Sequence, residues 1–177
     1  MRFHTATGAW DWWRGLNPTR FVAAPMVDQS ELAFRMLCRE LGVGLCYTPM
    51  MHARLMTEVP SYRKLHFDAG GPEDRPLFGQ LAGHDPQVVL SAARHVEDRV
   101  SAVDLNFGCP QAIARKGRYG AFLLEEPGLA VELVETLASG LSVPVTAKAR
   151  RLQPLYRGLR PCVVEAAAVC SGGCGCL

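Results

Sequence analysis

Short apolar segments alternate with amphipathic segments along most of the chain, and this alternation constrains the fold more than any other feature. The apolar segments are residues 21–24, 44–47, 77–81, 102–106 and 143–147. They are short and almost continuously apolar, which is typical of strands buried on both faces of a parallel sheet. The helical segments between them supply the crossover connections that parallel pairing requires. The sequence therefore predicts an α/β protein with a parallel sheet covered by helices.

Helix start and stop signals delimit the predicted helices. Asp28 is expected to cap the first helix, with Glu31 as its capping-box partner and Gly42 at its end. Asp85 and Pro127 are expected to open two later helices. Residues between the second and third strands form a polar connecting segment with a Gly-Gly-Pro turn.

A (β/α)8 barrel and a doubly wound sheet both fit this order of elements. No Gly-x-Gly-x-x-Gly pattern follows the first strand, which argues against a dinucleotide-binding Rossmann domain. The alternation stops after Arg150, and a complete barrel takes roughly 250 residues, whereas the chain has 177. We therefore expect an N-terminal extension over residues 1–20, a parallel α/β unit with five strands over 21–150, and an irregular tail rich in cysteine and arginine over 151–177.

Bulk composition narrows the setting and the partners. Residues 1–10 lack the apolar core of a signal peptide, and no apolar run approaches the roughly 20 residues that a membrane-spanning helix needs. A net charge of +2 is too small to indicate nucleic-acid binding by itself. The expected setting is cytoplasmic or nuclear, with reduced thiols and no membrane partner.

No metal site is predicted. Four of the seven cysteines crowd into the last 16 residues, but their spacing lacks the paired C-x-x-C knuckles of a zinc fold. The five histidines show no ligand spacing and are expected at the surface or in packing.

Polar residues follow the predicted strands at their C-terminal ends. Gln80 follows the third strand, Asn106 and Cys109 the fourth, and Lys148 the fifth. In parallel α/β proteins ligands bind and chemistry takes place at these ends. Each residue also has a simpler interpretation: Gln80 satisfies loop backbone groups, Cys109 packs as a core thiol, and Lys148 is solvated. Their shared position favours a functional site.

Four segments of the chain resemble the tRNA-dihydrouridine synthases, especially the eukaryotic dihydrouridine synthase 1-like type. They are Ala-Ala-Pro-Met-Val at 23–27, Gly-Gln-Leu-Ala-Gly at 79–83, Asp-Leu-Asn-Phe-Gly-Cys-Pro at 104–110 and Pro-Val-Thr-Ala-Lys-Ala-Arg at 144–150. The resemblance covers about residues 10–150. It implies that residues 21–150 are the N-terminal five-strand portion of a TIM barrel, which is incomplete because a full barrel takes roughly 250 residues. It implies an FMN-binding (β/α)8 barrel that reduces the C5–C6 double bond of uridine in tRNA, with NADPH or NADH as reductant.

The resemblance also implies roles for single residues. It makes Cys109 the proton donor to the uridine and places Asn106 near the flavin and the target base. The residues that match flavin-binding positions are Pro25, Met26, Val27, Gln80, Asn106 and Lys148. The basic loop that follows Cys109 is expected to contact tRNA phosphates through Arg115, Lys116 and Arg118.

Two alternatives remain open beside this interpretation. In the first alternative, the chain is a catalytically inert truncated form or an interaction fragment, because the later strands and the family's helical RNA-binding domain do not follow Arg150. Alternatively, it belongs to a different flavin barrel that reduces free pyrimidines. No stable protein partner is predicted.

Overall fold

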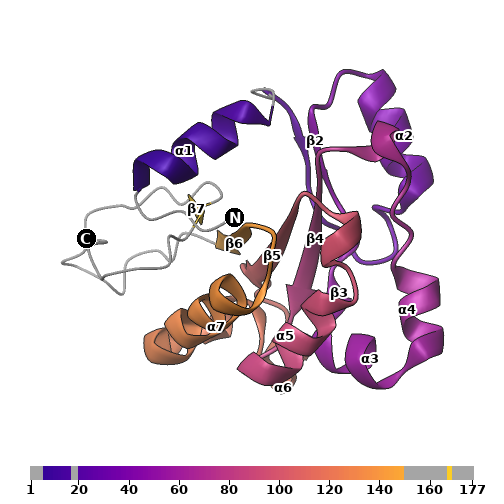
Figure 1. Cartoon of the computed structure of the whole chain (residues 1–177). Coiled ribbons are helices and arrows are strands. Elements are labelled where there is room, and N and C mark those ends of the chain that lie inside the picture. The colour runs from indigo at the N-terminus through magenta and orange to yellow at the C-terminus, as the bar shows by residue number, and fades with distance from the viewer. Residues whose placement is uncertain (1–5, 17–19, 150–166, 169–177) are drawn as a thin grey trace.

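A computed structural model describes residues 6–16, 20–149 and 167–168, and its centre is one curled sheet (Figure 1). The sheet has the strand order β1-β2-β4-β5-β6-β7, and β3 also pairs with β4. All pairings are parallel except the antiparallel contact of β6 with β7. The strands are β1 (Val22–Ala23), β2 (Leu45–Tyr47), β3 (Met51–His52), β4 (Leu77–Ala82), β5 (Ala102–Phe107), β6 (Val145–Ala149) and β7 (Ala167–Ala168). This curled parallel sheet is part of a TIM barrel, as predicted.

Helices connect the strands and cover the outer face of the sheet. The α-helices are α1 (Ala6–Gly15), α2 (Leu32–Glu40), α3 (Ala53–Glu58), α4 (Pro60–His66), α5 (Pro86–Arg94), α6 (Ala112–Lys116) and α7 (Pro127–Gly140). Short 3-10 turns occupy Pro72–Asp74, Glu97–Arg99 and Gly120–Glu125. The main hydrophobic core joins Leu77 and Leu81 of β4 to Val89 of α5 and Leu133 of α7.

The inner face of the sheet has its own apolar layer near the amino ends of the strands. Phe78 alternates with Leu77 along β4 and therefore points to the opposite face. It packs with residues of β2 and β5 under α1, which stands apart from the other helices (Figure 1). Trp12 stacks on the Phe78 ring at 5.8 Å, and Trp13 meets it edge-on at 6.2 Å. α1 therefore covers the inner face near the amino ends of the strands.

Two of the predicted helix starts are confirmed and one is wrong. The Asp85 carboxylate accepts hydrogen bonds from the backbone N–H groups of Gln87 and Val88 at the start of α5, and Pro127 begins α7. Asp28 does not cap α2, because its φ of +54° places it in a left-handed turn before the helix, and Glu31 makes no capping hydrogen bond.

The cap at the start of α2 is instead distant in sequence. The backbone N–H of Leu32 donates to Asp68 Oδ2 at 2.8 Å, across 36 residues. A local pattern of residues does not reveal a cap of this kind.

The connecting segment after β3 is more ordered than the sequence predicts. It contains α3 and α4, which have six and seven residues. Helices this short gain most of their stability from tertiary packing, so their own sequence periodicity is weak.

A strand interruption shapes the sheet beside Gln80. β2 and β3 both pair with β4, and the residues between them break the ladder. There the Thr48 hydroxyl accepts a hydrogen bond from the Gln80 backbone N–H at 3.1 Å, in place of a backbone carbonyl. This hydrogen bond satisfies the backbone N–H of Gln80 where the strand pairing is interrupted.

Two further expectations concern membrane-spanning helices and the C-terminal tail. Among the described residues, no helix has the length and apolar character to cross a bilayer. The predicted tail and its cysteine cluster lie outside the described residues, apart from β7.

Candidate active site

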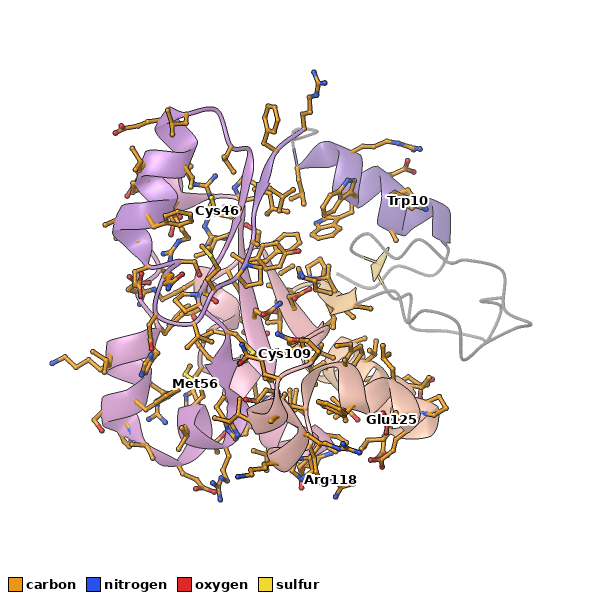
Figure 2. The ribbon with its side chains drawn as sticks, turned by 180° about the vertical axis from the view of Figure 1, so that it is seen from behind. Trp10, Cys46, Met56, Cys109, Arg118 and Glu125 are labelled. Atoms are coloured by element: carbon orange, nitrogen blue, oxygen red, sulfur yellow. The ribbon has the colours of Figure 1, made fainter. Side chains whose placement is uncertain are left out.

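Three predicted site residues lie on the inner face of neighbouring strands. The sheet register pairs Gln80 of β4 with Asp104 of β5, and Asn106 of β5 with Lys148 of β6. Because side chains alternate between the faces of a strand, all four of these side chains share one face. Cys109 follows β5 directly and lies beside the central strands (Figure 2).

The carboxylate of Asp104 is the centre of this group, and its role was not predicted from the sequence. Asp104 is fully buried. Its Oδ2 accepts a hydrogen bond from Gln80 Nε2 at 2.8 Å, and its Oδ1 accepts one from the Thr146 hydroxyl at 2.6 Å. A usable signal was present: Asp104 has the same strand parity as Asn106 and interrupts an otherwise apolar strand.

The surroundings of Asp104 oppose its ionisation. Burial raises the pKa of its carboxyl group from the ordinary 3.8 to about 6, although the hydrogen bonds from Gln80 and Thr146 and the charge of Lys148 act in the opposite direction. At neutral pH Asp104 is therefore mostly ionised and accepts hydrogen bonds only.

Asn106 connects this buried group to the loop that carries Cys109. Its Oδ1 accepts hydrogen bonds from the backbone N–H groups of Gly108 at 2.9 Å and Cys109 at 3.0 Å. Its Nδ2 donates to Gln80 Oε1 at 3.1 Å and lies 3.0 Å from the sulfur of Met50. We call the connected side chains of Thr146, Asp104, Gln80 and Asn106 the Asp104 network.

The Cys109 loop is also held from its other side. The Cys109 carbonyl accepts a hydrogen bond from the Ala121 N–H at 2.9 Å. Gly120 has a φ of +74°, and a Cβ at this position would overlap the same carbonyl oxygen. The thiol is partly buried, so it is restrained and still accessible to a reactant.

The remaining predicted flavin contacts lie in different surroundings. Lys148 is exposed at the carboxyl end of β6. Pro25, Met26 and Val27 follow β1 at one edge of the sheet, where the buried Ser30 hydroxyl bonds to the Met26 backbone at 3.0 Å. Within the described residues, the Asp104 network does not extend to this segment.

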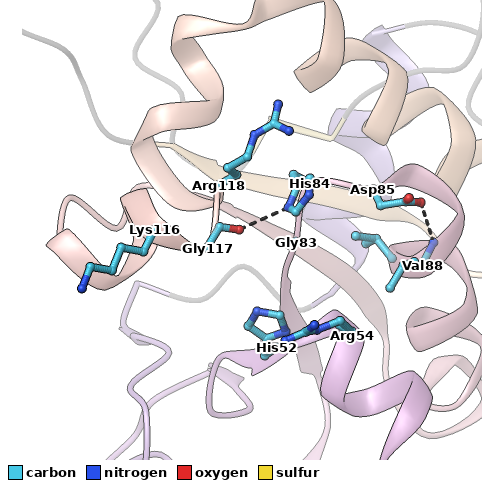
Figure 3. A pocket seen from close by; sticks show the side chains of 10 residues that line it. His52, Arg54, Gly83, His84, Asp85, Val88, Lys116, Gly117 and Arg118 are labelled. Atoms are coloured by element: carbon cyan, nitrogen blue, oxygen red, sulfur yellow. Dashed lines mark hydrogen bonds between the residues drawn. The ribbon is translucent and has the colours of Figure 1, made fainter.

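Two of the three predicted RNA contacts line a cavity of about 410 Å³ (Figure 3). The predicted basic loop is partly helical: Lys116 ends α6 and Arg118 follows it, whereas Arg115 of α6 stacks over the ring of Phe122. The sequence did not predict the other basic lining residues, which are His52, Arg54 and His84. They belong to segments distant in sequence, which only the fold brings to the Cys109 loop.

The charges that line this cavity favour anions, because Arg54, Lys116 and Arg118 outnumber the one lining carboxylate, Asp85, which caps α5. Burial and the nearby Arg54 lower the pKa of His52, so this ring stays neutral at pH 7. The Nδ1 of His84 stands 3.2 Å from the Gly117 carbonyl and donates to it, which ties β4 to the basic loop (Figure 3).

Comparison with known proteins identifies the family of the chain. The family model described as Dihydrouridine synthase (Dus) matches residues 22–177, so its match continues beyond Arg150. A tRNA-dihydrouridine(16/17) synthase of Saccharomyces cerevisiae is 54% identical over 136 residues, which are 76% of this chain and 32% of the relative. A similarly named protein of Rattus norvegicus is 49% identical over 151 residues, covering 84% of this chain and 34% of the relative.

More distant relatives have similar names. The tRNA-dihydrouridine synthase B of Pseudomonas aeruginosa is 35% identical over 136 residues, covering 75% of this chain and 40% of that protein. The chain spans about a third of the length of the yeast and rat relatives. Together with the family model, which matches most of the sequence, these similarities show that the chain belongs to the dihydrouridine synthase family.

Proposed function

We propose that this chain supplies the first part of the active site of a flavin-dependent tRNA-dihydrouridine synthase. The reaction adds a hydride to C6 and a proton to C5 of a uridine in tRNA. The observation that carries the proposal is that Asn106, on the strand face that also presents Gln80 and Lys148, holds the backbone of Cys109 just after β5. The relatives are named as NAD(P)-linked tRNA-dihydrouridine synthases, which supports the same reaction.

The described residues fit a bound FMN at the carboxyl ends of β4, β5 and β6. FMN, when bound and reduced by NADPH or NADH, supplies the hydride. Gln80 and Asn106 already bond within the Asp104 network, and Gln80 is fully buried, so in this proposal they form the polar floor beneath the flavin. The exposed ammonium of Lys148 offsets negative charge on the flavin. Pro25, Met26 and Val27 provide an apolar edge, with Met26 suited to an aromatic face.

The thiol of Cys109 performs the proton transfer in this proposal. A general acid must lie within hydrogen-bond reach of its acceptor and keep its geometry during the reaction. The two backbone bonds to Asn106 Oδ1 and the close packing against Gly120 restrain the loop in this way. After donating its proton to C5, the thiolate regains one from solvent, which the partial exposure of Cys109 permits.

The basic cavity beside this loop is the proposed RNA contact. A uridine inside a folded tRNA must leave its stack to reach the site, and the phosphates next to it then approach the surface. Lys116 and Arg118, with Arg54 opposite them, supply positive charge at that place. Phosphate binding there would hold the flanking nucleotides while the base enters.

Substitution of Cys109 tests the catalytic role. In a full-length synthase that carries the matching loop, Cys109→Ala is expected to leave flavin reduction by NADPH unchanged and to slow dihydrouridine formation by about 10²–10⁴-fold, the usual contribution of a positioned general acid. Cys38→Ala, on the helical side of the sheet, is the matched control. Dihydrouridine formation at the normal rate by the Cys109 variant would refute the proton-donor role.

The 177-residue chain can be tested directly for the activity that we propose. The purified protein should retain the visible absorbance of a flavin after incubation with FMN and removal of the excess, and should form dihydrouridine in unmodified tRNA. Neither bound flavin nor dihydrouridine would mean that this chain alone is catalytically inert. Reduction of free uracil without reduction of tRNA would instead favour a barrel that acts on free pyrimidines.

A further inference from the structure

The hydrogen bonds of the Asp104 network have a single direction that both of its ends impose. At one end the ionised Asp104 carboxylate accepts only, so the Gln80 group that faces it must be the NH₂. Gln80 Oε1 then faces Asn106 and requires its NH₂. At the other end two backbone N–H groups donate to Asn106 Oδ1. The two ends demand the same orientation of both amides.

We propose that Asp104 is a positioning residue, which sets the orientation of the Gln80 and Asn106 amides and through them holds the backbone that carries the Cys109 thiol. This inference rests on the proposed function for its meaning in catalysis. The structural part of the inference does not depend on that function: Asp104, two positions before Asn106 in β5, restrains residues 108–109. Asp104 itself is fully buried and acts only through its neighbours.

A neutral amide at position 104 would remove one of the two sources of this direction and leave only the backbone N–H groups at the Asn106 end. A carboxamide there can present either its oxygen or its NH₂ to Gln80, because the Thr146 hydroxyl can donate or accept. If the NH₂ faces Gln80, the Gln80 amide must turn over, and its NH₂ then faces the NH₂ of Asn106. The carboxylate excludes this second arrangement, which explains why a charge is kept in a position that opposes it.

Exchanging the two functional groups provides the decisive test. Both single substitutions preserve side-chain size: Asp104→Asn removes the directing charge, and Gln80→Glu places a second carboxylate against that of Asp104. In the double variant the carboxylate introduced at position 80 accepts from the amide introduced at position 104 on one side and from Asn106 Nδ2 on the other. The Thr146 hydroxyl donates to the oxygen of the amide at position 104. The double variant therefore restores every hydrogen bond of the network and keeps the original orientation of the Asn106 amide toward Cys109.

The measurement is made on the 177-residue chain without flavin or RNA. Hydrogen exchange of the Gly108 and Cys109 amides and the alkylation rate of Cys109, both followed by peptide mass spectrometry, report the order of the loop. We expect each single variant to increase amide exchange by about tenfold or more, which corresponds to the loss of a hydrogen bond of about 1.4 kcal/mol, and to change the alkylation rate. We expect the double variant to return both values to within about threefold of the wild type.

Controls separate positioning from general damage. Exchange of the Leu133 and Val134 amides in α7 reports whether each variant is folded, and Thr146→Val removes a donor to Asp104 that lies outside the path to Cys109. We expect Thr146→Val to loosen the loop less than Asp104→Asn. Wild-type exchange in both single variants, or a double variant no better ordered than the singles, would overturn the proposal. Because no readout depends on turnover, these results are independent of whether the chain is an active synthase.

Discussion

At the scale of single residues, the buried carboxylate of Asp104 is the feature with the clearest energetic consequence. The folded protein binds its proton more tightly than the unfolded chain does, since burial raises the pKa to about 6 from 3.8. Its contribution to the free energy of unfolding is therefore most favourable below about pH 4 and declines as pH rises to about 6. Above that pH the decline amounts to about 3 kcal/mol.

Asp104→Asn should accordingly stabilise the protein at neutral pH. We expect the free energy of unfolding to increase by about 1–3 kcal/mol at pH 7.5 and by about a third as much at pH 4.5, where the folded protein still holds the proton that the unfolded chain has largely lost. Urea unfolding of both proteins at the two pH values measures this. Equal stability differences at both pH values would show that the carboxylate does not titrate as described.

The sequence predicted four residues of the candidate site and did not predict Asp104 at its centre. Asn106, Cys109 and Lys148 stand near or just after the end of a strand, where one strand read by itself points to function, whereas Gln80 lies within β4. Asp104 and Thr146 lie inside their strands, and their contact depends on the register between β5 and β6. The register is set by packing across the whole sheet, which one strand does not reveal.

At the scale of elements, the loop from β5 to the 3-10 turn at Gly120–Glu125 depends on one close approach. Gly120 has a positive φ, and its α-carbon faces the Cys109 carbonyl at a distance that leaves no room for a Cβ. The neighbouring Tyr119 is buried and packs edge-on against the His52 ring at 5.7 Å. The loop therefore has little freedom to move away.

Gly120→Ala should displace the Cys109 loop. We expect a loss of about 1–3 kcal/mol in the free energy of unfolding from the unfavourable φ and the clash, together with a changed alkylation rate at Cys109. Gly128→Ala in α7 is the matched control, because a Cβ there meets no atom within 4 Å. An equal effect of the two substitutions would contradict the proposed close packing.

Helices whose start signals are local in the sequence were predicted correctly, and those that depend on distant residues were not. The starts of α5 and α7 were predicted correctly because their signals are local: the Asp85 carboxylate bonds within the first turn of α5, and proline fits the first turn of α7. The cap of α2 and the short helices α3 and α4 were not predicted, since they depend on Asp68 and on the packing of α3 against α5 and of α4 against α3.

At the scale of the whole molecule, the net charge is small and positive side chains gather at the basic cavity. The net charge of +2 gives little general attraction to RNA, so binding should depend on the basic cavity beside the Cys109 loop. The cavity brings together Arg54 of α3 and Lys116 of α6, which the curled sheet places on one side of the molecule (Figure 3). Site-specific charge of this kind makes binding sensitive to salt and to single substitutions.

Lys116→Ala should weaken the binding of unmodified tRNA and reduce its salt dependence. Loss of one phosphate contact lowers the slope of log affinity against log salt by about 0.7–0.9, measurable by filter binding between low and physiological salt. Arg94→Ala, at the exposed C-terminal end of α5, removes the same charge away from the cavity and should leave the slope unchanged. Equal slopes for wild type and Lys116→Ala would place the RNA elsewhere.

The stacked rings beneath the site also make the protein its own optical sensor. Trp12 and Trp13 are fixed against Phe78, and Gln80 follows two residues later, about 7 Å along the same strand. Indole emission overlaps the near-ultraviolet absorption of flavins, so a flavin resting near Gln80 would quench both indoles by energy transfer. Trp10, which is 53% exposed on α1, would fluoresce at longer wavelength and mark the background. Cofactor occupancy becomes a quantity that can be titrated by fluorescence, without labels and without turnover.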